Sequence, residues 1–327
     1  MIRMLAAVGA GLLSFGASEA LAQPGTEGQA TRPSHTAAPA ASSRVSFRPM
    51  RPTQGTFVLV AVRLPNNTAG DSLDVEATLA GEPLHFTRER DGVYRALAGI
   101  PIDAPDTLHS TVVVQRNGTA AETLAVALPV TRASYPVERL TVAPEFGREP
   151  DSLLNARLEE ESRRAMAVSA NSHETARLWK APLARPRPGR VTSGYGRGRE
   201  YNGVVQSRHM GTDFAGASGT PVRAIARGVV ALVDTFYLGG RVLYVDHGAG
   251  LVTAYLHLSR AVAAVGDTVE RGEVIGRVGA TGRVTGPHLH MVARYGKTTL
   301  DPMSLLRLLG EAPSARTRQA GKGGAPR

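Results

Sequence analysis

Two pairs of residues in the C-terminal half of this 327-residue chain have the types and spacing of metal ligands. His288 and His290 are two apart, and residues two apart in a β-strand point to the same face. His209 and Asp213 are four apart, again an even spacing, and Gly211 between them allows the chain to bend. A catalytic zinc site takes three imidazole or carboxylate ligands and leaves a fourth position for water. The sequence therefore predicts a zinc site built from His209, Asp213 and one histidine of the 288/290 pair.

Such a site implies hydrolytic chemistry. The metal would lower the pKa of its bound water towards ~7 and polarise the scissile carbonyl of a substrate. The histidine of the 288/290 pair that does not bind the metal would lie beside that water, and its unperturbed pKa suits a general base. Spacing alone leaves the division of roles within the pair open, and it favours a core position for His257. Each pair also occurs on ordinary strands, so the prediction depends on finding them together.

The elements that must position these side chains are short β-strands. From about residue 186 to 310 the chain is rich in glycine, and strand patterns alternate with turn signals such as Gly239-Gly240. The predicted strands cover residues 222–233, 241–246, 251–258, 268–278 and 288–295. A helical pattern returns only at residues 302–306. The prediction for this part is an all-β domain, a glycine-rich antiparallel sheet.

The N-terminal half is predicted to be β-rich as well. Strand patterns at residues 56–62, 73–77, 93–97, 111–115 and 124–130 are separated by turn signals, which is typical of a small antiparallel β-sandwich. We place this domain at residues 46–143 and a helical linker at residues 144–185. Asp151 is a suitable cap for a helix over about 151–168. We expect the first domain and this helix to restrict access to the metal site until a partner or substrate moves them.

The two ends of the chain predict export and disorder. Arg3, an apolar run over residues 5–15 and the small-x-small motif Ala20-Leu21-Ala22 indicate a secretory signal peptide, residues 1–22, cleaved after Ala22. The run is too short to span a bilayer comfortably. Residues 23–45 are predicted to be a disordered leader and residues 311–327 a disordered basic tail. The mature chain would then be periplasmic or extracellular, with no transmembrane segment.

Composition excludes several classes of function. The chain has no cysteine, which removes disulfides, thiolate zinc ligands and cysteine nucleophiles. A net charge of +10 attracts polyanions of many kinds. Aromatic residues make up only 5% of the chain, too few for a large base-stacking surface, and we expect no nucleic-acid partner. We expect a monomer, and the sequence identifies no regulatory partner.

Several segments of the C-terminal domain occur together in a known family. They are Ser193-Gly194-Tyr195-Gly196, His209-Met210-Gly211-Thr212-Asp213-Phe214, Asp246-His247-Gly248, Tyr255-Leu256-His257-Leu258 and Thr285-Gly286-Pro287-His288-Leu289-His290. In this order they resemble the lysostaphin-like (LytM-type) zinc metallopeptidases over about a third of the chain. The N-terminal sandwich is similar, at residues 94–101, to the domain that precedes this peptidase in some exported bacterial members.

The resemblance assigns roles that spacing cannot. It implies that His209, Asp213 and His290 bind one Zn²⁺ ion and that His288 is the catalytic histidine beside the metal's water. It makes His257 a second active-site histidine, which supports that water or the developing oxyanion. His247 remains structural. No role falls to the four histidines outside the domain, His35, His85, His109 and His173.

The expected function follows from the resemblance. It implies a zinc metalloendopeptidase that hydrolyses peptide cross-links of bacterial peptidoglycan. The alternative, from a different class, is a non-catalytic LytM-type module that binds cell wall and activates a separate hydrolase, as some relatives do after losing ligands. All five expected positions are occupied in this chain, which favours the enzyme.

Overall fold

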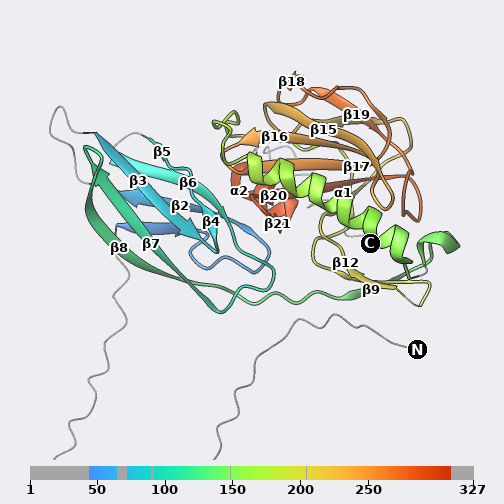
Figure 1. Ribbon diagram of the computed structural model, residues 1–327, viewed down its shortest axis with the longest axis horizontal. Helices are drawn as coiled ribbons and strands as arrows, with labels where there is room; N and C mark the ends of the chain where they lie inside the picture. The colour runs from blue at the N-terminus through green and yellow to red at the C-terminus, as the bar shows by residue number, and fades with distance from the viewer. Residues whose placement is uncertain (1–43, 65–71, 90–91, 148, 204, 311–327) are drawn as a thin grey trace, which may run out of the picture. The chain divides into compact units, whose positions relative to one another are not determined.

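The computed structural model describes residues 44–64, 72–89, 92–147, 149–203 and 205–310 (Figure 1). Within these ranges the protein is mostly β, as predicted, with the α-helices α1 (Ser152–Asn171) and α2 (Pro302–Leu309) and the short 3-10 helix η2 (Pro144–Phe146). Neither α-helix is long and apolar enough to cross a bilayer. The predicted signal peptide, the leader up to residue 43 and the tail 311–327 lie outside the described residues.

The N-terminal β region consists of two four-stranded sheets, with strand orders β1-β2-β6-β5 and β4-β3-β7-β8. The strands are β1 (Val45–Arg48), β2 (Phe57–Arg63), β3 (Leu73–Leu79), β4 (Glu82–Pro83), β5 (Thr87–Arg88), β6 (Val93–Gly99), β7 (Thr107–Arg116) and β8 (Thr119–Pro129). Apolar residues alternate along them, so one face of each sheet is buried. Val62 and Tyr94 from the first sheet meet Val75, Val112 and Val126 from the second. This is the predicted antiparallel sandwich.

The C-terminal β region is a ten-stranded antiparallel sheet whose central order is β13-β20-β17-β16-β15. Its strands are β10 (Val191–Ser193), β13 (Thr212–Ala215), β14 (Pro221–Arg223), β15 (Gly228–Phe236), β16 (Gly240–Gly248), β17 (Leu251–Ala261), β18 (Thr268–Val269), β19 (Val274–Val278), β20 (His288–Tyr295) and β21 (Thr298–Leu300). Two predicted strands are each divided. Ile225 breaks the first because its N–H donates to the Tyr255 hydroxyl instead of a strand neighbour. Gly272, with φ of 85°, breaks the second.

A small third sheet, with the order β12-β11-β9, has no counterpart in the sequence prediction. The hairpin of β11 (Gly198–Tyr201) and β12 (Val205–Arg208) forms within the glycine-dense segment. Strand β9 (Val137–Leu140), from the connection after the sandwich, pairs in parallel with β11. The side chain of Asn202 fixes Val142, two residues after the end of β9, by two hydrogen bonds of 3.0 Å to its backbone. The connection between the two β regions therefore contributes a strand, β9, to the small sheet of the C-terminal part.

The two α-helices pack against different strands of these β regions. Helix α1 is capped as predicted, because the Asp151 carboxylate accepts from Leu154 N–H at 2.9 Å, and it ends three residues beyond the predicted end. Its Ala165 packs against apolar residues of β15, β16, β17 and β20. Helix α2 lies next to β2, where Ser304 Oγ accepts from Phe57 N–H at 3.0 Å. Residues of both β regions and α2 share one hydrophobic core.

Candidate metal centre

The register of two neighbouring strands determines the centre of the site. Strands β13 and β20 are antiparallel, with Asp213 opposite His290 and Ala215 opposite His288. The Asp213 Oδ1 atom lies 2.7 Å from His290 Nδ1 and 3.6 Å from His288 Nε2. The two histidines therefore share one face of β20, as their spacing predicts.

His209 reaches the same place from the segment that precedes β13. Its N–H donates to the Arg197 carbonyl and its own carbonyl accepts from Gly196 N–H, both at 2.7 Å. The neighbouring Gly211 permits a close approach to β20, because a Cβ atom at that position would lie 2.5 Å from His290 Nε2. The glycine expected to allow a bend thus also makes room for the His290 ring.

Three candidate ligand atoms converge at this point. His209 Nε2 lies 3.0 Å from Asp213 Oδ1 and 2.9 Å from His290 Nδ1. His209 Nδ1 lies 2.8 Å from the Gly194 carbonyl, which can only accept, so Nδ1 carries the proton and Nε2 presents a lone pair. A lone pair that faces a carboxylate oxygen is repelled unless a cation lies between them. The donor set therefore fits a metal ion, and within the described residues these three form the group with metal-binding geometry.

The surroundings of Asp213 and His290 set the protonation of both groups. Burial acts to raise the pKa of Asp213, but the neighbouring His209 and His290 rings together outweigh it and hold that pKa well below its usual range. Burial lowers the pKa of His290 to about 4, against the opposing effect of Asp213. Near neutral pH the cluster thus holds a carboxylate anion and a neutral His290 imidazole, which are the states that bind a metal.

His257 and His288 lie beside the three candidate ligands. The ring centroid of His257 is 5.0 Å from that of His288 and 5.7 Å from that of His290. His288 Nδ1 donates to the Gly286 carbonyl and His257 Nδ1 to the Thr281 carbonyl, each at 2.8 Å. Both rings therefore keep an Nε2 lone pair when neutral. Burial, with His290 and His288 nearby, lowers the pKa of His257 well below its ordinary value.

The backbone of His257 is strained. Its φ of 61° lies in the left-handed region that residues with a side chain rarely adopt, at a cost of about 1–3 kcal/mol. The residue lies in β17, and its N–H donates to the Gly239 carbonyl at 2.9 Å. Such strain is concentrated at functional sites, and here it accompanies the placement of the ring beside His288. The His257 ring is buried, in keeping with the core position that spacing alone favours, and its active-site role stays a prediction.

The structure adds two charged residues that the sequence did not indicate. Arg199, on β11, donates from Nη2 to Asp213 Oδ2 at 2.7 Å, so both carboxylate oxygens of Asp213 are engaged. Glu138, on β9, accepts from Arg197 Nη1 and from Ser193 Oγ at 2.9 Å each. Ser193 Oγ in turn lies 3.1 Å from His209 Nδ1. No local spacing signals this network, because Glu138 precedes Ser193 by 55 residues.

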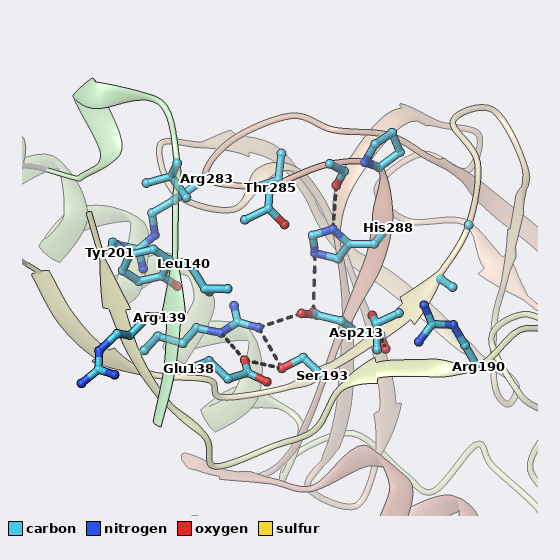
Figure 2. A pocket seen from close by; sticks show the side chains of 18 of the residues that line it. Glu138, Arg139, Leu140, Arg190, Ser193, Tyr201, Asp213, Arg283, Thr285 and His288 are labelled. Atoms are coloured by element: carbon cyan, nitrogen blue, oxygen red, sulfur yellow. Dashed lines mark hydrogen bonds and ion pairs between the residues drawn. The ribbon is translucent and has the colours of Figure 1, made fainter. Parts of the chain in front are cut away.

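A cavity of about 780 Å³ opens beside Asp213 and His288 (Figure 2). Its walls come from β9, β10, β11 and the residues 283–287 that precede β20. A smaller cavity of about 230 Å³ is lined by His209, His257 and His290. Neither cavity is lined by residues of the sandwich strands β1–β8 or of helix α1. Strand β9, which lies within the residues 46–143 assigned to the first domain, lines the larger cavity, and the restriction of access by that domain and by the helix stays a prediction.

The remaining histidines lie elsewhere. His247 is fully buried and bonds the Arg227 carbonyl and Thr253 hydroxyl at 2.8 Å each, in keeping with a structural role. His85 and His173 contact each other, and His109 is exposed on β7. His35 lies outside the described residues.

Comparison with known proteins identifies the domain. The model of peptidase family M23 matches residues 207–302, which include all five predicted site residues. The chain carries an M23 peptidase domain. The chain is 44% identical over 82 residues to the peptidoglycan DD-endopeptidase ShyC of Vibrio cholerae, a match that covers 25% of this chain and 19% of that protein. The DD-carboxypeptidase/endopeptidase Mpg of Neisseria meningitidis is 45% identical over 97 residues, covering 30% of this chain and 22% of that protein.

A solved structure resembles this chain over more than the matched residues 207–302. A crystal structure from Pseudomonas aeruginosa, assigned to peptidase M23, matches with a TM-score of 0.57 and 27% identity. It covers 78% of this chain and 95% of that chain, far more than residues 207–302. The region of this chain before residue 207 therefore shares in the likeness. The chain nevertheless spans only about a fifth of the length of the two curated relatives.

Proposed function

We propose that this chain is an exported, zinc-dependent metalloendopeptidase that hydrolyses peptide cross-links of bacterial peptidoglycan. The observation that carries the proposal is the convergence of His209 Nε2, Asp213 Oδ1 and His290 Nδ1 next to a cavity. Three protein ligands of these types are the number that a catalytic zinc site uses. The names of the relatives, peptidoglycan DD-endopeptidases among them, support the substrate class.

The chemistry needs proton transfers that this chain's own residues can supply. When bound, zinc provides a Lewis acid that polarises the scissile carbonyl and makes an attacking water more acidic. His288 is the general base: Gly286 fixes its Nδ1 proton, so Nε2 is free to take a proton from the water. The same Nε2 then returns the proton to the leaving amine as the peptide C–N bond breaks.

The hydrogen bond from His257 Nδ1 to Thr281 bears on which of two roles His257 has, support of the attacking water or of the oxyanion. Its Nδ1 proton is committed to the Thr281 carbonyl, and its lowered pKa keeps Nε2 unprotonated. An unprotonated Nε2 accepts a hydrogen bond and does not donate one to an oxyanion. We therefore propose that His257 orients the attacking water, which is one of the two roles that the family resemblance implies.

Two histidine variants and a control test this function. Metal content by elemental analysis and release of fragments from cross-linked muropeptides are measured on the mature chain. His290→Ala is expected to lose both metal and hydrolysis. His288→Ala is expected to keep its metal and lose about 10²- to 10⁴-fold in hydrolysis, the usual contribution of a general base. His109→Ala, exposed on the sandwich, should match the wild type in both measurements.

The outcomes separate the enzyme from the alternative. A wild-type chain that held no metal and released no fragments, but stimulated a separate wall hydrolase, would be the non-catalytic module. Hydrolysis by His290→Ala at the wild-type rate would overturn the proposed mechanism. Export with cleavage after Ala22 is part of the same proposal, and N-terminal sequencing of the periplasmic or secreted protein checks it.

A further inference from the structure

The larger cavity has a positive lining. Four arginines line it, Arg139, Arg190, Arg199 and Arg283, against two carboxylates, Glu138 and Asp213. Arg199 is held by Asp213, and Arg139 Nε lies 3.5 Å from a carboxylate oxygen of Glu200. Among the described residues no ion pair engages Arg190 or Arg283, so their charges are available to a ligand.

Arg283 is the better positioned of these two. Its guanidinium carbon lies 3.9 Å from the centroid of the Tyr201 ring, and Tyr201 is itself only 3% exposed. Its backbone N–H donates to the Leu238 carbonyl at 2.9 Å, which fixes the middle of the loop 279–287 between β19 and β20. Stacking on an aromatic face holds the plane of a guanidinium and leaves its N–H edge free. The Arg283 side chain is half-buried, and burial lowers its pKa.

The position of Arg283 connects it with the proposed chemistry. It belongs to the loop that supplies the Thr281 and Gly286 carbonyls, which orient His257 and His288. In Figure 2, Arg283 and Tyr201 lie on one side of Asp213 and His288, and Arg190 lies on the other. A peptide that crosses the cavity with its scissile bond at His288 would therefore meet Arg283 on one side of that bond.

We propose that Arg283 is a specificity-determining residue that binds a carboxylate of the substrate peptide. This inference rests on the proposed function. It adds that the enzyme prefers a substrate peptide that carries a free carboxylate near the scissile bond. A guanidinium with a fixed plane pairs with a carboxylate through two parallel N–H···O bonds, which a neutral amide in the same place cannot reproduce. Arg190 is exposed and contributes only a screened, long-range attraction.

The test compares two synthetic cross-linked wall peptides that differ in one respect. One carries free carboxylates, and in the other the same groups are primary amides. The wild-type enzyme is expected to favour the carboxylate substrate in kcat/KM. Arg283→Gln should lower kcat/KM for the carboxylate substrate by about 10- to 100-fold, the range for a lost hydrogen-bonded charge pair, and leave the amide substrate within about twofold. Arg283→Lys keeps the charge and should lie between the two.

The controls distinguish specificity from packing. Arg260→Gln changes an exposed arginine of β17 that lines neither cavity, and it should leave both rates unchanged. Metal content and thermal unfolding of Arg283→Gln should match the wild type. An equal loss on both substrates, or no wild-type preference, would overturn the role of Arg283 while leaving the peptidase proposal intact. A wild-type enzyme that cleaved neither substrate would overturn the peptidase proposal, and this inference with it.

Discussion

Two groups of histidine and carboxylate side chains lie in the described part of the molecule, and their atoms face one another differently. In the first, His209, Asp213 and His290 are buried and one candidate ligand atom of each converges, with the lone pair of His209 Nε2 facing the carboxylate oxygen Asp213 Oδ1. In the second, His173 Nε2 donates to Glu82 Oε2 at 3.1 Å, and His85 Nε2 lies 2.8 Å from His173 Nδ1. The second group is a line in which each contact pairs a donor with an acceptor.

The difference shows why the first group is the candidate metal site. Residue type is shared, since both groups combine two histidines with one carboxylate. In the second group, neutral rings satisfy every contact, so no cation is needed. In the first, the Gly194 carbonyl fixes the His209 proton on the far side of the ring, which leaves a lone pair facing Asp213. The hydrogen bonds around the group, more than its composition, distinguish a metal centre from a structural contact.

The largest expected effect separates the two carboxylates. Asp213→Asn removes the anionic oxygen of the first group, and its zinc affinity should fall by more than the about 10- to 100-fold typical of residues outside the ligand set. Glu82→Gln changes the second group in the matched way and should leave zinc affinity unchanged. Competition with a chelating dye measures both dissociation constants. Equal weakening by the two variants would mean that the groups do not differ as proposed.

A smaller effect concerns the residue that holds Asp213. Arg199→Gln removes the hydrogen bond to Asp213 Oδ2, and zinc affinity should fall by about 10- to 100-fold. Arg197→Gln is the control, because Arg197 pairs with Glu138 and has no hydrogen bond to Asp213. Arg199→Lys should restore part of the affinity. If Arg197→Gln weakened zinc as much as Arg199→Gln, the effect would belong to the Glu138 network and not to Asp213.

The sequence predicted the features of the fold and of the site that depend on the residues of a single helix or strand. The shared face of His288 and His290, the strand 288–295 and the cap at Asp151 all follow from short-range rules, and the structure confirms them. The choice of His290 over His288 as ligand stays a proposal, and the shorter distance from Asp213 to His290 supports it.

Other parts depend on register and on distant segments. Arg199 meets Asp213 only because the β11–β12 hairpin folds beside β13, and Glu138 arrives on a parallel strand from the preceding connection. A parallel pairing between segments so far apart leaves no periodic signal in either one. The breaks at Ile225 and Gly272 likewise depend on partners that the chain's local pattern does not show.

The smallest expected effect lies in the second group and appears in stability alone. Burial acts to raise the pKa of Glu82, but the hydrogen bonds with His173 and Lys297 N–H outweigh it, and the pKa is lowered. A carboxyl whose folded pKa is lowered stabilises the fold above its unfolded pKa, and this stability is lost as pH falls through the folded pKa. Glu82→Gln should therefore cost about 1 kcal/mol at pH 7 and little below the folded pKa.

Urea unfolding of the metal-free protein, followed from about pH 7 down through the acid range in which carboxyl groups titrate, measures this loss. Glu159→Gln, an exposed position on α1, is the matched control and should follow the wild-type curve throughout. Parallel curves for Glu82→Gln and the wild type would show that the carboxylate adds no pH-dependent stability. If zinc affinity is unchanged in Glu82→Gln and its unfolding curve converges with that of the wild type at low pH, the second group has a structural role alone. It would then be a stabilising contact between β4 and the residues that follow α1.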